Sequence, residues 1–264
     1  SDLVILGHAY GASPEMFLRG RTLARRALVL DDGSGDAHAV LGHIAFEYDW
    51  DWPEAERHFR RAIELNPSSA RAHHIYGGGF LVAMSRFAEA DREMQLASGL
   101  DPLSPGIAAA AAFPALHAGR YADAEGMLRR AVRASTSEDT EALEWLGLVH
   151  ALQGRYADAI DEMRRAGSAA GLRAWAFALA GQPDSARAQL NEVQRRARSG
   201  YVPPRQLVLA NLAVGNRARA LDYLEAAYRD RSRDMAWINV MPTLAALRGE
   251  QRFQALLARM RFPR

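Results

Sequence analysis

A repeat of 35 residues constrains the fold of this chain more than any other feature of its sequence. Leu65–Asn66–Pro67 returns as Leu100–Asp101–Pro102 with its prolines 35 residues apart, and Asp32 lies the same distance before Pro67. Units that recur with a period of roughly 20–50 residues bury too little apolar surface alone and must stack on their neighbours. The sequence therefore predicts an array of repeats, each packed only on the next.

Within the repeat, small and large apolar residues recur in a fixed order. Alanines recur in register at Ala27, Ala62, Ala97, Ala131 and Ala166, larger residues lie three positions earlier at Phe59, Met94, Leu128 and Met163, and further alanines lie four positions before those at Ala55, Ala90, Ala124 and Ala159. Spacings of three and four residues place side chains on one face of an α-helix. Small residues let two helices cross closely, and the large residue fills the space between hairpins. This pattern predicts the second helix of a helical hairpin.

A complementary pattern predicts the first helix and the turn that follows it. Equivalent positions hold Leu6–Gly7, Leu41–Gly42, Tyr76–Gly77 and Leu146–Gly147, and the turn appears as Gly119–Arg120–Tyr121 and Gly154–Arg155–Tyr156. Glycine ends a helix readily because it adopts the left-handed conformation without penalty. Asn-Pro or Asp-Pro ends the second helix, because the residue before a proline avoids helical geometry.

These patterns predict an all-α, right-handed superhelical solenoid of about seven hairpins over residues 1–230. The hairpins are expected at 2–31, 35–66, 69–101, 104–134 and 138–167, followed by two degenerate ones that include Ala174–Leu190 and Leu207–Ala227. Residues 231–264 are expected to form an irregular segment and a helix that caps the last apolar face. Because the first residues read as mid-domain sequence, we expect a fragment of a larger protein.

Composition narrows the classes of function. The chain has no Cys, which excludes a disulfide scaffold, a Cys-based zinc site and a Cys nucleophile. No apolar run approaches the roughly 20 residues of a membrane helix, so no membrane contact is expected. We expect a cytoplasmic location, or a periplasmic one if the parent is a membrane-integrated regulator. The formal net charge is only +2, but acidic residues gather over 31–64 and arginines over 195–264.

The helical patterns resemble the tetratricopeptide repeat (TPR) family, and three passages resemble the C-terminal TPR region of large bacterial signalling proteins. These passages are residues 48–62 from Tyr48-Asp49-Trp50-Asp51-Trp52 onward, residues 72–77 with Asp101–Ser104, and the tail residues 247–260. In that family such arrays follow a winged-helix DNA-binding domain, a serine/threonine kinase domain or a nucleotide cyclase domain. The resemblance implies a protein-interaction or sensory module that regulates a fused effector. The tail has Glu250–Gln251 where the family usually has Asp-Pro.

The concave groove of such an array is the predicted site for a partner protein or peptide, because first-helix side chains repeat along one continuous surface there. The predicted lining residues are Asp36, His43, Phe46, Glu47, Arg71, His74, Leu81, Phe113, His117, Glu144, Leu148 and Trp175. Three readings stay open: a peptide groove, self-association or docking within the chain, and no ligand. Self-association that sets the oligomeric state of the parent is the alternative function, so a homo-oligomer is possible.

Other features of the sequence favour structural roles. His38, His43, His73, His74, His117 and His150 lack metal-ligand spacing, so we expect no metal and no cofactor. No catalytic constellation stands out, which predicts a protein that is not an enzyme. Arg195, Arg196 and Arg198 lack stacking aromatics beside them, so nucleic-acid binding by this chain is not expected. Asp51 is expected to cap the helix that contains Pro53, and Gly77–Gly79 to allow close packing or a kink.

Overall fold

The computed structural model describes residues 14–134, 140–167 and 169–263, and within these ranges every regular element is helical. The first elements are α2 (Pro14–Leu30), α3 (Gly35–Ile44), the π-helix η2 (Ala45–Asp49), α4 (Trp52–Leu65), α5 (Ala70–His74), the π-helix η3 (Ile75–Leu81) and α6 (Phe87–Leu100). They are followed by α7 (Pro105–Ala110), α8 (Phe113–His117), α9 (Tyr121–Ala134), α10 (Thr140–Leu152), α11 (Tyr156–Arg165), α12 (Ala170–Leu179), α13 (Pro183–Ser199), α14 (Pro204–Ala213) and α15 (Arg217–Arg229). The 3-10 helices η4 (Arg233–Trp237) and η5 (Pro242–Leu247) and the helix α16 (Gln251–Met260) complete the fold.

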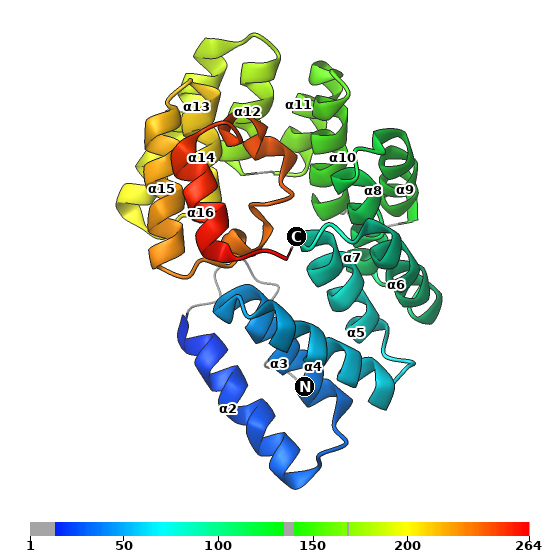
Figure 1. Ribbon diagram of the computed structural model, residues 1–264. Coiled ribbons are helices and arrows are strands. Elements are labelled where there is room, and N and C mark those ends of the chain that lie inside the picture. Colours follow the sequence, from blue (N-terminus) through cyan, green and yellow to red (C-terminus); the bar gives the residue numbers. More distant parts are fainter. Residues whose placement is uncertain (1–13, 135–139, 168, 264) are drawn as a thin grey trace.

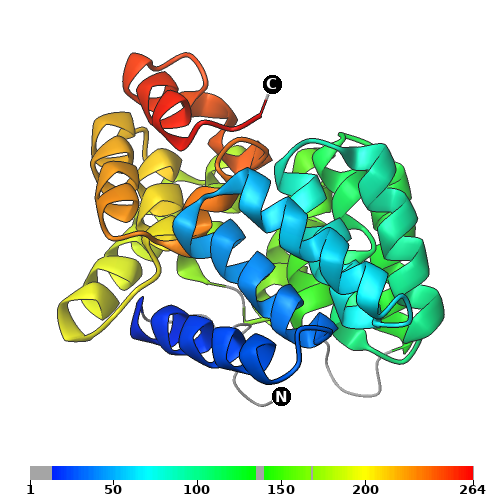
Figure 2. The ribbon, with the colours of Figure 1, turned by 60° about the horizontal axis from the view of Figure 1, so that its bottom comes forward.

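Consecutive helices pair into hairpins that stack side by side into a curved array (Figure 1). The first helices of the successive hairpins are α3 continued by η2, α5 continued by η3, α7 continued by α8, and then α10, α12 and α14. The second helices are α4, α6, α9, α11, α13 and α15. Figure 2 shows the second hairpin facing the last helices across the curve. Leu6 and Gly7, which are predicted for the first helix of the first hairpin, lie outside the described residues. The predicted all-α solenoid is confirmed.

The core consists of the residues that the repeat pattern singles out. Phe59, Leu128 and Met163 are 0% exposed and Met94 is 2% exposed, so each large residue fills the space between helices. The alanines four positions earlier, Ala55, Ala90, Ala124 and Ala159, are all fully buried. The same arrangement continues in the degenerate hairpins, where Ala186 and Ala220 are also 0% exposed. The small and large positions thus hold the helices together along the whole described array.

Side-chain caps recur with the same period. Ser34, Ser69 and Ser104 lie 35 residues apart, and each is the N-cap of a first helix. Their hydroxyl oxygens accept from the amides of Ala37, Ala72 and Ile107 at 3.3, 3.2 and 3.4 Å. Asp51 caps α4 by accepting from the amide of Glu54 at 3.1 Å, as expected. Each cap satisfies an amide that the helix leaves without a partner, and so fixes where the helix begins.

The first helices of the second to fourth hairpins depart from regular α geometry. The glycine triplet lies in η3, where a Cβ on Gly77 would come within 2.6 Å of the Glu93 Cβ and one on Gly78 within 2.9 Å of the Met94 sulfur. The glycines therefore allow η3 to pack closely on α6, as the sequence predicts. The next first helix breaks into α7 and α8 just before Pro114, which has no amide proton to donate.

The C-terminal segment, defined here as residues 231–262, both caps the array and crosses its interior. Helix α16 packs on α15 and buries Phe253, Leu256 and Met260. Before it, η4 and η5 run across the inside of the curve toward the second hairpin, visible as the orange part of the chain in Figure 1. The sequence predicts only a cap on the last repeat. The structure shows that the segment also joins the two ends of the array.

Candidate functional site

A pocket of about 220 Å³ lies on the concave face of the array. One wall comes from first helices of successive hairpins, and η4 and η5 of the C-terminal segment form the opposite wall. The lining residues are His74, Gly106, Ala110, Phe113, His117, Glu141, Glu144, Trp145, Leu148, Leu172, Arg205, Leu209, Arg233, Asp234, Trp237, Met241, Pro242 and Thr243. Concave sites with a few polar groups among apolar walls are the usual place for ligands.

Aromatic side chains shape this pocket. The rings of Phe113 and Trp145 are 4.6 Å apart at an interplanar angle of 59°, and the rings of Phe113 and His117 meet edge to face at 6.2 Å. Trp237 comes from η4 on the opposite side, and its ring lies 6.4 Å from that of His117. These rings are only partly buried, so apolar surface remains inside the pocket. Such surface suits an apolar anchor side chain of a partner.

His117 is held neutral inside the pocket. Its Nδ1 donates to the carbonyl oxygen of Phe113 at 2.8 Å, one helical turn earlier. Burial lowers the pKa of His117 to about 4, because an imidazolium there would lose its hydration, and the bond to Phe113 offsets only part of this effect. Near neutral pH this side chain therefore presents an uncharged ring and one acceptor nitrogen, Nε2.

A buried ion pair fixes the C-terminal segment to the second hairpin. Glu47 is 3% exposed and lies 2.8 Å from Nη2 of Arg233 and 2.9 Å from Nε2 of His43. Burial alone would raise the pKa of Glu47, but the neighbouring His43 and Arg233 outweigh burial and lower it to about 2. A carboxylate desolvated to this degree requires such partners. Arg233 therefore stabilises the buried carboxylate of Glu47.

Aromatic side chains of the second hairpin also contact the C-terminal segment. Trp52 Nε1 donates to the carbonyl oxygen of Met260 at 2.9 Å, and the Trp52 ring stacks on Phe262 with centroids 5.0 Å apart. Deeper in the groove, the ring of Phe46 meets Trp237 edge to face at 5.5 Å. Sequence reasoning missed this closure. Its one signal was the charge asymmetry, since the acidic stretch over 31–64 and the arginine-rich tail are the parts that meet.

The structure places the predicted groove residues in several different environments. His74, Phe113, His117, Glu144 and Leu148 line the pocket together. His43, Phe46 and Glu47 contact one another or the C-terminal segment, and Phe46 is only 1% exposed. Leu81 is fully buried in the core, Trp175 packs against that core, Asp36 is exposed, and Arg71 is partly buried. Phe46 is covered by the rings of Trp52 and Trp237, which lie 6.3 and 5.5 Å from its own ring. Trp145 and Trp237 are pocket residues that the prediction did not include.

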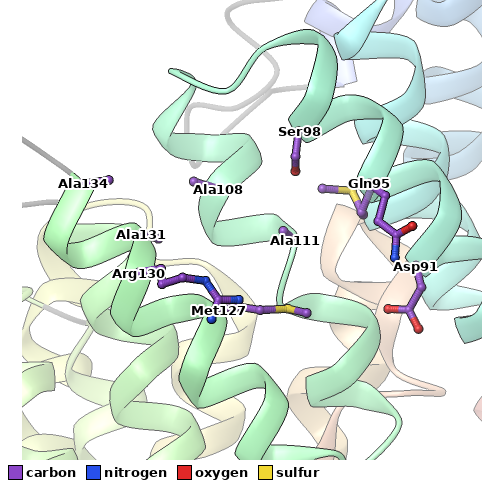
Figure 3. Close-up of a pocket in the computed structure, with 10 residues that line it drawn as sticks. Asp91, Gln95, Ser98, Ala108, Ala111, Met127, Arg130, Ala131 and Ala134 are labelled. Atoms are coloured by element: carbon purple, nitrogen blue, oxygen red, sulfur yellow. The ribbon is translucent and has the colours of Figure 1, made fainter.

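A second, more open cavity of about 430 Å³ lies on the outer side of the array, between α6, α7 and α9. Figure 3 shows why it exists: Ala108, Ala111, Ala131 and Ala134 present only methyl groups to it. Asp91 at its edge is paired with Arg120 at 2.6 Å. The break between α7 and α8 adds to the space. This cavity has few polar groups and no cluster of charges aimed into it.

The remaining histidines of the predicted cluster serve the packing of helices. His73 Nδ1 lies 2.6 Å from a carboxylate oxygen of Glu93, and His150 Nδ1 lies 2.6 Å from one of Glu162. Opposing effects act on the pKa of His150: burial lowers it, but the two neighbouring glutamates prevail and raise it. Within the described ranges, three or more His, Asp or Glu side chains nowhere gather as metal ligands would. Among the described residues, no helix has the length and apolar character needed to cross a membrane.

Comparison with known proteins agrees with this architecture. The model of a family described as "Tetratricopeptide repeat" matches residues 115–171. The type IV pilus assembly protein PilF of Pseudomonas aeruginosa is 28% identical over 128 residues, which are 48% of this chain and 50% of PilF, so the chain matches about half the length of that relative. The crystal structure of PilW, a type IV pilus biogenesis factor, matches with a TM-score of 0.53 at 18% identity, over 92% of this chain and 91% of PilW.

The solved structure of Pseudomonas aeruginosa PilF also has a TM-score of 0.53, at 21% identity, over 86% of this chain and 98% of that one. At these identities the solved structures show a shared fold. The sequence repeat, the stacked hairpins and the family match agree with one another. The chain therefore has the fold of a tetratricopeptide repeat array, and its residues 115–171 match the model of that family.

Proposed function

We propose that this protein is a non-catalytic scaffold that binds a partner protein or peptide in the concave pocket between its first helices and η4. Tetratricopeptide repeat arrays generally mediate protein–protein interaction. The observation that carries the proposal is the set of partly buried aromatic residues Phe113, Trp145 and Trp237 around a cavity of about 220 Å³. Buried aromatic anchors supply much of the binding energy at protein interfaces.

The charges at the rim suit a peptide with a mixed sequence. Glu141 and Glu144 stand on α10, and Arg205 and Arg233 approach from α14 and η4. An apolar anchor would enter between the rings, and flanking polar groups of the peptide would meet this rim, which sets orientation more than affinity. The bound part of the partner would be a short peptide segment, because the C-terminal segment already fills the neighbouring part of the groove.

The proposal extends to regulation of a fused effector domain in a longer parent protein. The resemblance of residues 48–62 and 247–260 to the C-terminal arrays of bacterial signalling proteins supports this role. The contact between the C-terminal segment and the second hairpin supports it as well, because a partner that displaces the segment would change the curvature of the whole array.

Selection from a random peptide library, followed by fluorescence anisotropy with the selected peptides, tests the proposal. We expect peptides with a single aromatic or large aliphatic anchor, and we expect Trp145→Ala to weaken their binding by about tenfold or more. Leu103→Ala is the matched control, because Leu103 is 90% exposed and lies outside the pocket. Selected peptides that bind Trp145→Ala and the wild type equally would place the binding surface elsewhere.

A further inference from the structure

The junction between the second hairpin and the C-terminal segment contains a third cavity, of about 360 Å³, with a concentration of arginines. It is lined by Asp49, Trp50, Tyr228, Arg229, Arg231, Arg259, Met260 and Arg261. The second hairpin supplies Asp49 and Trp50, and the last turns of α15 and α16 with the residues after them supply the rest. We call this cavity the seam pocket.

Stacking fixes two of the arginines. The rings of Tyr228 and Trp50 stack with their centroids 5.2 Å apart. The Arg259 guanidinium lies 4.2 Å from the centroid of the Tyr228 ring, and the Arg231 guanidinium lies 5.3 Å from that of the Trp50 ring. A guanidinium that stacks by its face keeps its N–H groups in the plane, directed away from the ring. Arg231 uses Nη1 to donate to the carbonyls of Tyr48 at 3.0 Å and Asp49 at 3.4 Å, and within the described residues its Nε and Nη2 donate to no protein group.

Three residues that line the seam pocket have a left-handed backbone conformation. Trp50, Arg231 and Arg261 have φ of 58°, 51° and 53°, and Ser85 is the one other non-glycine residue with positive φ in the described ranges. Elsewhere the chain places glycine in this conformation, as at Gly154 and Gly215. Strain at such positions persists when the side chain is needed there, and it is found preferentially at binding sites.

Within the described residues, no ion pair neutralises the arginines of the seam pocket. Arg229, Arg231, Arg259 and Arg261 have no carboxylate oxygen within 4.0 Å among the described residues. Asp49 is the one carboxylate lining the pocket in those residues, and Arg21 Nη2 contacts both of its oxygens at 2.7 Å. The C-termini of α15 and α16 add about half a negative charge each, which is less than the four guanidinium groups contribute.

We propose that the seam pocket binds a small phosphate anion, with pyrophosphate as the simplest representative of its class. Guanidinium groups pair with phosphate oxygens through two parallel hydrogen bonds, which a monovalent carboxylate cannot provide to four arginines at once. The four arginines lie at the ends of α15 and α16 and in the residues after them, so a bound anion would hold these two C-terminal turns together. This site is separate from the concave pocket and does not depend on the function proposed above.

Isothermal titration of the protein with pyrophosphate, in phosphate-free buffer at about 0.15 M NaCl, tests the assignment. We expect saturable binding of one pyrophosphate per chain, and an affinity reduced about tenfold or more in Arg229→Ala/Arg261→Ala. Arg198→Ala is the control, since it removes one exposed arginine of α13 that does not line the pocket. Absence of saturable binding, or an equal loss in Arg198→Ala, overturns the proposal, and so does equal affinity for sulfate.

Arg261→Gly separates a ligand-binding role from a structural one. Glycine relieves the positive φ at this position, so the variant should melt at a higher temperature than the wild type without ligand. The same variant should bind pyrophosphate several-fold more weakly. Wild-type affinity in a stabilised Arg261→Gly chain would contradict the assignment, because this arginine would then contribute nothing to the ligand.

Discussion

At the scale of single residues, the buried carboxylate of Glu47 depends on its charged neighbours, because burial disfavours its charge and His43 and Arg233 favour it. Replacing Arg233 by Met leaves this carboxylate, 3% exposed, with His43 as its remaining close partner. Loss of one member of a buried pair is strongly destabilising, and we expect a decrease of about 3 kcal/mol in the free energy of unfolding. Urea denaturation measures it. Arg187→Met is the control, because its contact with Asp184 at 3.9 Å is exposed and should contribute about 1 kcal/mol or less.

If Glu47 is the reason for that loss, Glu47→Gln/Arg233→Met should be more stable than Arg233→Met alone. The interaction also predicts a pH dependence. The folded-state pKa of Glu47 is about 2, below its ordinary 4.5, so its contribution is complete above pH 4.5 and is lost as the pH falls toward 2. A double variant no more stable than the single one would show that Arg233 acts through other contacts.

His117 gives a second, separate pH dependence. Its folded-state pKa is about 4, below the ordinary 6.5, because the ring is buried. The unfolded chain therefore takes up a proton first, and stability should fall by about 2–3 kcal/mol as the pH falls from 6.5 to 4. His117→Gln removes this contribution, so its unfolding free energy should depend less on pH over the same range. Urea denaturation at several pH values decides; parallel curves for both proteins would contradict the assignment.

At the scale of elements, close helix contacts depend on individual glycines. A Cβ on Gly171 would lie 2.3 Å from the carbonyl oxygen of Gln206, so α12 touches the backbone of α14 there. Gly171→Ala should therefore cost about 1–3 kcal/mol. Gly126→Ala is the matched change in α9, where the nearest contact would be the end of Arg130 at 3.7 Å, and it should stabilise by about 0.5–1 kcal/mol. Thermal unfolding should separate the two variants in opposite directions; equal shifts would contradict this account of Gly171.

The helices themselves could be predicted from the sequence because their core positions repeat. Phe59 and Ala62 have counterparts in the next hairpin at the same spacing, so each hairpin supports the assignment of the others. The π-helical turns in η2 and η3 could not be predicted in this way. They depend on how closely one helix approaches its neighbour. This is a property of the packed pair of helices, and no repeating residue pattern in the sequence indicates it. Phe46 was placed on the open concave surface, whereas Trp237 of the C-terminal segment packs on its ring and leaves it 1% exposed.

At the scale of the whole molecule, the closure of the array joins residues that are far apart in the sequence. Trp52 and Met260 are 208 residues apart, and no repeat pattern links them. Repeat sequences specify contacts between neighbouring hairpins, so they leave the relation between the two ends undetermined. The candidate pocket was therefore only half predictable: its first-helix wall follows from the repeat, and its η4 wall, with Trp237, does not.

The closure can be tested by weakening it from the C-terminal side, where the repeat core is untouched. Arg233→Met removes the ion pair with Glu47, and Phe262→Ala removes the ring that stacks on Trp52. Because the hairpins pack on their neighbours independently of these contacts, the double variant should keep its helical circular dichroism while its radius of gyration, measured by small-angle X-ray scattering, increases. Leu103→Ala/Arg198→Met, two exposed changes of the same kinds, should leave it unchanged. A double variant as compact as the wild type would mean that repeat stacking alone sets the curvature, and that the C-terminal segment follows the closure without maintaining it.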